Sequence, residues 1–186
     1  MTGNDTGQTA GLLAALTDPC RRDDAFRQLM RLYGRRLYWH IRRIVVSHDD
    51  AEDVLQEVCI KILDNIASCR DEAALTAWLF RVATNEALQH LRRQTHFMQD
   101  IDSLNPELAD RMEAETPLDA DAAEVLFQRA LLTLPTTQRI VFNMRYYDDM
   151  PYEEMSQILG TSVGALKASY HFAVEHIAQF FKQLEE

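Results

Sequence analysis

The segment from residue 49 to residue 93 constrains the fold of this chain more than any other, because its apolar residues recur at helical spacing. Steps of three and four residues place side chains on one side of an α-helix. Two such stripes are separated by the polar run at residues 68–72. Their members are Ala51, Val54, Leu55, Val58, Ile62 and Ile66 in the first, and Leu75, Leu79, Val82, Ala83, Ala87 and Leu91 in the second. The segment therefore predicts two amphipathic helices.

The outer faces of these two predicted helices carry different chemistry. The first presents an acidic ridge, which we define as Asp53, Gln56 and Glu57. The second presents a polar stripe, which consists of Arg81, Asn85, Gln89, Arg92 and Arg93. Amide and guanidinium groups are the side chains that pair with base edges and phosphates. The polar stripe is therefore a candidate nucleic-acid surface.

Two further helices are predicted before this segment. A short apolar run at residues 12–16 ends before Pro19, and residues 23–46 carry a long apolar stripe. The second helix is rich in arginine outside its stripe. Those arginines form either a solvated face or a path along nucleic acid. We expect residues 10–95 to pack as one all-α domain.

The C-terminal part of the chain has the pattern of a helix-turn-helix. Helical periodicity returns at residue 122 and continues on both sides of Pro135, which marks a helix boundary. A short amphipathic helix then ends at Gly160, which can adopt positive φ, and Ser162 is placed to cap a long final helix. In this motif the second helix enters the major groove of DNA. Residues 122–186 are thus predicted to form a second all-α domain.

The net charge of −10 lies mostly between these two domains. Residues 1–93 hold 13 basic and 13 acidic groups, whereas residues 94–124 hold one basic and nine acidic groups. The segment at residues 96–121 shows no periodicity and contains two prolines, so it predicts an acidic linker. The overall charge therefore does not exclude nucleic acid, although neither domain is basic enough to favour tight autonomous binding.

Several function classes lack support in the sequence. No apolar run approaches the roughly 20 residues of a membrane span, and the polar N-terminus has no signal-peptide core, which predicts a cytoplasmic protein. Cys20, Cys59 and Cys69 show no paired spacing, so we predict neither a disulfide nor a metal site, and packing is the expected role of Cys59. We find no catalytic motif or phosphate loop, and therefore expect no enzyme activity and no cofactor.

Four runs of sequence carry a resemblance to a known family. The runs DAEDVLQEV (residues 50–58) and TAWLFRVATN (residues 76–85) resemble region 2 of bacterial extracytoplasmic-function sigma factors. The runs YEEMSQILG (residues 152–160) and SVGALK (residues 162–167), with the pair at residues 134–135, resemble region 4. The blocks occur in the family's order and spacing. Membership implies a transcription initiation factor that binds core RNA polymerase and promoter DNA.

The resemblance also implies roles for single residues. The acidic ridge would bind a basic coiled coil of the polymerase clamp, and Arg70 with the polar stripe would bind the melted −10 element, one base of which is flipped out. Trp78 would either stack on that base or lie in the core. The −35 element would be bound by Ser162, Lys167, Ala168, Ser169 and His171.

The chain departs from the family at three positions. Cys69 stands where an aromatic residue is common, and Ser169 and Phe172 stand where arginines are common. Phe172 is therefore predicted either to face DNA or to pack in the core. The family's linker passes through the polymerase cleft, where an acidic chain could occupy the place of RNA phosphates.

The resemblance further implies an anti-sigma partner and a role in a stress or envelope response. Two alternatives remain open. One is a sigma-like decoy that sequesters a regulator, and the other is a stand-alone helix-turn-helix regulator.

Overall fold

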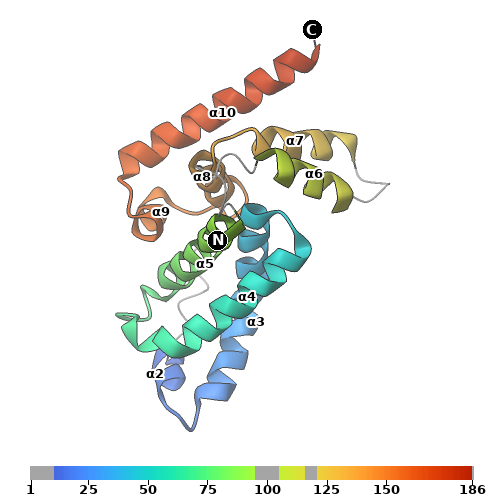
Figure 1. Cartoon of the computed structure of the whole chain (residues 1–186). Helices are drawn as coiled ribbons and strands as arrows, with labels where there is room; N and C mark the ends of the chain where they lie inside the picture. Colours follow the sequence, from blue (N-terminus) through green and yellow to red (C-terminus); the bar gives the residue numbers. More distant parts are fainter. Residues whose placement is uncertain (1–10, 95–104, 116–120, 186) are drawn as a thin grey trace.

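The computed structural model describes residues 11–94, 105–115 and 121–185, and in these ranges it contains helices and no strands (Figure 1). This confirms the all-α prediction. The elements are α2 (Leu12–Thr17), α3 (Arg22–Val45), α4 (His48–Asn65), the 3-10 turn η1 (Ile66–Ser68), α5 (Leu75–Gln94), α6 (Asn105–Glu115), α7 (Ala122–Leu132), α8 (Thr136–Tyr146), α9 (Tyr152–Leu159) and α10 (Val163–Glu185). None of the described helices is both long and apolar enough to cross a membrane.

The N-terminal half consists of α2 to α5, and its core combines residues of α2 and α3 with the two stripes predicted from the sequence, of which Leu55 and Val82 are only half-buried. Helix α3 packs against both α4 and α5, which also pack against each other. The buried side of α4 consists of Ala51, Val54, Val58 and Ile62, and that of α5 includes Leu75, Leu79, Ala83, Ala87 and Leu91. Since each stripe is buried, the acidic ridge and the polar stripe must lie on the outside.

The turn between α3 and α4 fixes the direction in which α4 leaves. Val46 has a φ of 69°, a conformation that is unusual for a β-branched residue. Its backbone N–H donates to the Arg42 carbonyl at 2.8 Å, which ends α3. Ser47 then caps α4 by accepting a hydrogen bond from the Asp50 backbone N–H at 3.3 Å.

The C-terminal half contains α7, α8, α9 and α10. Helix α10 packs against the other three and extends past them toward the C-terminus (Figure 1). A core separate from that of the N-terminal half lies between α7, α8 and α10, and it consists of Ala130, Leu131, Leu134, Phe142, Ala173 and Ile177. Helices α9 and α10 form the predicted helix-turn-helix.

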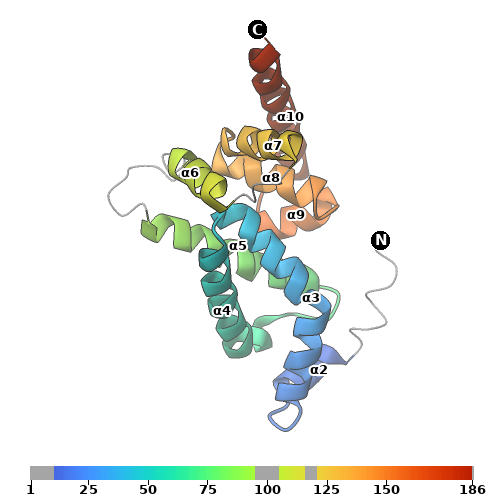
Figure 2. The same cartoon turned by 90° about the vertical axis from the view of Figure 1, so that its right-hand side faces the viewer.

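The two halves also share apolar contacts. Helix α8 packs against α3, and α9 packs against α5, so that α8 and α9 lie next to the N-terminal half in both views (Figures 1 and 2). Val141, Met144, Met155 and Ile158 belong to the same buried cluster as the core of α3, α4 and α5. The closed arrangement of the two halves is therefore held by a continuous hydrophobic core.

The segment predicted as an acidic linker without periodicity contains helix α6, and here the sequence reading was incomplete. Leu108 and Met112 are buried at a spacing of one helical turn, and the helix packs against α7. An ion pair of 2.6 Å between Arg129 and Glu113 joins these two helices.

Candidate protein and nucleic-acid interfaces

The acidic ridge lies on the solvent side of α4. Asp53, Gln56 and Glu57 are all exposed, while the neighbouring Val54 and Val58 are buried. The ridge is thus a rigid row of polar groups on a helix whose other side is fixed in the core. Such a row can orient and select a basic protein partner.

Sequence reasoning missed an apolar residue beside this ridge. Ile60 is 52% exposed and follows Gln56 and Glu57 by one helical turn. Such a side chain can add an apolar contact to a polar protein interface, because interfaces combine an apolar core with a polar rim. The signal in the sequence that could have revealed an exposed Ile60 was its position outside the apolar stripe of α4.

The polar stripe lies on the solvent side of α5. Arg81, Asn85, Gln89, Arg92 and Arg93 are all exposed in the structure. The stripe is held in place because Ala83, Ala87 and Leu91 on the opposite side are fully buried. An ion pair of 2.9 Å between Lys61 and the buried Glu86 joins α5 to α4. The acidic ridge and the polar stripe therefore belong to one rigid unit.

A pocket of about 470 Å³ lies at the start of α5, and we call it the α5 pocket. It is lined by Ser68, Arg70, Ala74, Ala77, Trp78, Arg81 and Gln157. Trp78 is only 5% exposed, and its indole N–H donates to Ser68 Oγ at 3.2 Å. Of the two roles predicted for Trp78, the core position is the one observed. Its buried ring forms part of the pocket wall.

Cys69 lies in the loop between η1 and α5 and is buried. Its thiol donates to the Asp71 carbonyl at 3.4 Å, and burial raises the pKa of this thiol above its usual value. Burial likewise raises the pKa of Cys59, as expected for a packing residue. No cluster of potential metal ligands occurs among the residues that the structure describes.

The helix-turn-helix has the local geometry that its sequence predicts. Gly160 ends α9 with a φ of 65°, and Ser162 Oγ accepts from the Ala165 backbone N–H at 3.3 Å at the start of α10. Lys167, Ala168 and His171 are exposed. Ser162, which is also a predicted −35 residue, is exposed as well, whereas Ser169 is half-buried.

Phe172 points away from the core of the C-terminal half. Its side chain is 56% exposed, whereas the adjacent Ala173 is fully buried. Of the two predicted environments for Phe172, the structure shows the exposed one. Lys167 lies over the Tyr152 ring with its Nζ 5.7 Å from the centroid, so this cation is directed partly toward α9.

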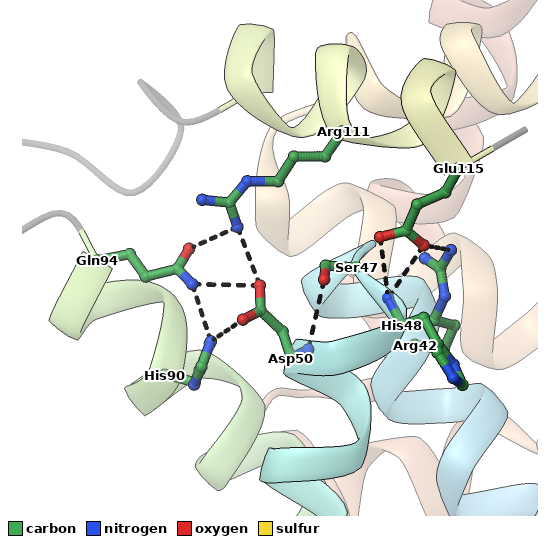
Figure 3. A network of polar contacts seen from close by, with 8 residues as sticks. All are labelled: Arg42, Ser47, His48, Asp50, His90, Gln94, Arg111 and Glu115. Atoms are coloured by element: carbon green, nitrogen blue, oxygen red, sulfur yellow. Dashed lines mark hydrogen bonds and ion pairs between the residues drawn. The ribbon is translucent and has the colours of Figure 1, made fainter.

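A polar network holds α6 against the N-terminal half (Figure 3). Arg111 donates to Asp50 Oδ2 at 2.9 Å and to Gln94 Oε1 at 3.2 Å. His90 Nε2 lies 3.2 Å from the other oxygen of Asp50. Through these contacts, Arg111 joins α6 to the start of α4 and the end of α5. We call Asp50, His90, Gln94 and Arg111 the linker network.

Glu115 makes a second contact between α6 and the N-terminal half (Figure 3). Its carboxylate accepts from the backbone N–H of His48 at 3.0 Å and from Arg42 at 2.8 Å. A carboxylate is favoured at this place because the first N–H groups of a helix lack intrahelical partners. The acidic character of the segment thus serves, at Glu115, to cap α4.

Comparisons with known proteins identify the family. Residues 29–97 match Sigma-70 region 2, and residues 124–177 match Sigma-70 region 4. The chain is 30% identical over 162 residues to the ECF RNA polymerase sigma-E factor of Escherichia coli, covering 82% of this chain and 84% of the relative. It is 27% identical over 170 residues to the ECF sigma factor SigW of Bacillus subtilis, covering 87% and 91% respectively.

Solved structures share the fold. The sigma factor RpoE of Bartonella quintana, crystallised with the anti-sigma factor NepR, superposes with a TM-score of 0.66 at 21% identity, covering 84% of this chain and 96% of that one. CnrH in complex with the cytosolic domain of CnrY superposes with a TM-score of 0.64 at 22% identity, covering 92% and 96%. With both sigma regions matched in order, and a sigma-E relative at 30% identity over most of its length, this chain belongs to the extracytoplasmic-function family of bacterial RNA polymerase sigma factors.

Proposed function

We propose that this sigma factor uses three separate surfaces in transcription initiation. Residues 10–95 act as region 2, residues 96–121 as the linker and residues 122–186 as region 4. Within region 2, the acidic ridge on α4 and the polar stripe on α5 are both exposed, and they are two different surfaces of one rigid unit. This exposure is the observation that most supports separate roles for the surfaces.

The acidic ridge is proposed to bind core RNA polymerase. Asp53 and Glu57 supply negative charge toward a basic coiled coil, and Gln56 lies between them. The exposed Ile60 adds an apolar contact at the edge of the same surface. Charged groups at such an interface contribute orientation and specificity more than affinity.

The polar stripe is proposed to bind the melted −10 element, with Arg70 and Arg81 at the α5 pocket. Extruding a base costs a few kcal/mol, so a pocket with stacking or hydrogen-bonding groups must offset that cost. Guanidinium planes can stack on a base and bind its phosphate. Because Trp78 is buried with its indole N–H satisfied, we assign the contact with the base to the arginines instead.

Helix α10 is proposed to bind the −35 element through Ser162, Lys167, Ala168, Ser169 and His171. Lys167 and His171 are the basic residues on this surface. With so few basic groups, the surface binds phosphates only weakly. That suits a domain delivered to DNA by polymerase. We further propose that the protein acts in the cytoplasm, where core polymerase is, has no enzymatic activity of its own, and is controlled by an anti-sigma partner in a stress or envelope response. The similar sigma factor RpoE of Bartonella quintana was crystallised with such a partner, the anti-sigma factor NepR.

Transcription in vitro tests this function directly. The full chain would be added to purified core polymerase on fragmented genomic DNA of the source organism, and the 5′ ends of the transcripts would be sequenced. We expect start sites that share upstream motifs and that are absent without the chain. Polymerase binding without transcripts would instead support a decoy, and a duplex DNA shift without polymerase would support a stand-alone regulator.

A further inference from the structure

The α5 pocket is not built by the N-terminal half alone. Six of its lining residues come from η1, from the loop that follows it and from α5, whereas Gln157 comes from α9 in the helix-turn-helix. In the closed arrangement, a helix of the C-terminal half thus forms one wall of the pocket assigned to the −10 element.

The position of α9 over α5 is fixed by buried contacts. Met155 is fully buried and Ile158 is 5% exposed, and both belong to the core cluster that includes Leu79 and Ala83 of α5. Interiors of this kind are close-packed, so α9 cannot move away from the pocket by a small adjustment. A DNA strand bound along the polar stripe from Asn85 toward Arg70 would pass Arg81. Gln157 of α9 lines the same pocket as Arg81.

Polar contacts at the turn before α9 hold the two halves together. The side chain of Asp148 lies between two groups of α3, with its Oδ1 3.0 Å from Arg43 Nη1 and its Oδ2 3.3 Å from His40 Nδ1. His40 is buried and also contacts Thr84 of α5 at 2.8 Å. The Arg43 guanidinium in addition lies over the Tyr147 ring, 4.2 Å from its centroid. The side chain of Asp148 is only 9% exposed, and such charge-assisted contacts are stronger than those on an open surface.

We propose that the free protein blocks its own −10 surface. In the closed state, α9 occupies one side of the α5 pocket, and the contacts of Asp148 with α3 stabilise that state. Single-stranded DNA therefore binds only after the halves separate, which makes the closed state and the DNA-bound state alternatives. This inference rests on the role proposed above for Arg70 and Arg81.

The size of the effect follows from the population of the open state. When only a fraction of the protein is competent to bind, the apparent dissociation constant is the intrinsic one divided by that fraction. Removing one partner of a partly buried, charge-assisted contact should shift the equilibrium about tenfold or more. The apparent affinity for single-stranded DNA should then rise by about the same factor, until the open state predominates.

The test compares two neighbouring carboxylates in the full chain. Asp148→Asn removes the charge between the halves. Asp149→Asn removes the same charge one residue later, from an exposed side chain whose partner, Arg145, lies in its own half. Asparagine is tolerated at the positive φ of position 149. Arg43→Gln breaks the contact from the other half and serves as a second opening variant.

Two measurements are made on each variant after circular dichroism has confirmed its helical content. Small-angle X-ray scattering gives the radius of gyration, and fluorescence anisotropy gives the affinity for a randomised 12-nucleotide single-stranded DNA. We expect Asp148→Asn and Arg43→Gln to enlarge the radius and to raise the affinity about tenfold, whereas Asp149→Asn should resemble the wild type. Adding Arg81→Ala to Asp148→Asn should remove the gain.

The contrary results are distinct. An unchanged radius and unchanged affinity in both opening variants would overturn the proposed contact at Asp148. A larger radius without tighter DNA binding would overturn the blocking of the α5 pocket. A gain that persists with Arg81→Ala would show that DNA binds elsewhere, which would contradict the proposed −10 surface, while transcription with core polymerase tests the sigma factor function independently.

Discussion

Replacing Phe172 by arginine should strengthen DNA binding by α10 without unfolding the C-terminal half. Phe172 is 56% exposed, so an arginine at this position can keep its charge in water. Substitutions at such positions usually change the free energy of unfolding by less than about 0.5 kcal/mol. For a chain of this length, that corresponds to a melting shift of about 1–2 °C.

The gain in DNA binding can be estimated from counterion release. Each additional phosphate contact steepens the slope of log affinity against log salt by about 0.9. Between 50 and 200 mM salt, that is about a three- to fourfold stronger loss of affinity per contact. Adding Ser169→Arg should bring the total change of slope to about 1.8, because the long side chain can reach outward from its half-buried position.

The assay is a salt titration of the full chain with a duplex of arbitrary sequence, since phosphate contacts do not depend on sequence. Gln183→Arg is the matched control, because it adds the same charge at an exposed site of α10 but lies about 16 Å further along the axis. We expect a steeper slope for Phe172→Arg but not for Gln183→Arg, and an unchanged melting temperature for both. A melting temperature lowered by 10 °C or so would show that arginine at position 172 buries a charge, and would refute the exposed placement.

Three further outcomes are expected. Lys61→Ala should lower the free energy of unfolding by about 1–3 kcal/mol, because its partner carboxylate on α5 is buried, whereas Arg27→Ala, in an exposed pair, should have an effect below about 1 kcal/mol in denaturant titrations. Arg111→Ala should release α6, which would appear as faster hydrogen exchange in residues 105–115 with little change in α4. In the folded protein at neutral pH, iodoacetamide should modify the exposed Cys20 well before Cys69, because burial raises the pKa of Cys69 and leaves less thiolate; mass spectrometry of the alkylated peptides would show equal rates if this is wrong.

The elements that sequence reasoning predicted are those whose signal is local. The apolar stripes of α4 and α5 repeat over several turns, and they are buried as expected except at Leu55 and Val82, which are half-buried. Gly160 and Ser162 likewise predicted the turn of the helix-turn-helix, because a positive φ and a cap each depend on the type of a single residue. Exposure of the acidic ridge and of the polar stripe follows from these stripes. Their roles in binding remain predictions.

Helix α6 could not be predicted in the same way. It has eleven residues, a length at which an isolated helix is marginal in water, and among its residues whose burial the structure describes, Leu108 and Met112 are the buried ones. Its stability depends on tertiary contacts, above all those of Arg111 with Asp50 and of Glu115 with the start of α4. Contacts between residues more than 60 positions apart leave no periodic pattern in the sequence.

The contacts between the two halves were missed for a related reason. His40 lies within the apolar stripe of α3, three residues after Leu37, and it is buried together with that residue. A histidine in such a stripe indicates a buried polar partner, but not which one. The ambiguities at Trp78 and Phe172 had the same origin, because helical spacing alone does not say which side a neighbouring domain covers.

The central claim is that the acidic ridge and the polar stripe perform separate steps, and titrating sigma factor against a fixed amount of core polymerase tests it most directly. Open complexes would be counted by permanganate reactivity on a promoter identified in the transcription experiment. Asp53→Ala with Glu57→Ala should shift the titration to higher sigma concentration and reach the wild-type plateau. Asn85→Ala should keep the wild-type midpoint and reach a lower plateau, since losing a bidentate base contact costs about 1–3 kcal/mol. Equal midpoints and equal plateaus for all three proteins, or a shifted midpoint for Asn85→Ala with a full plateau, would contradict the assignment of these two surfaces.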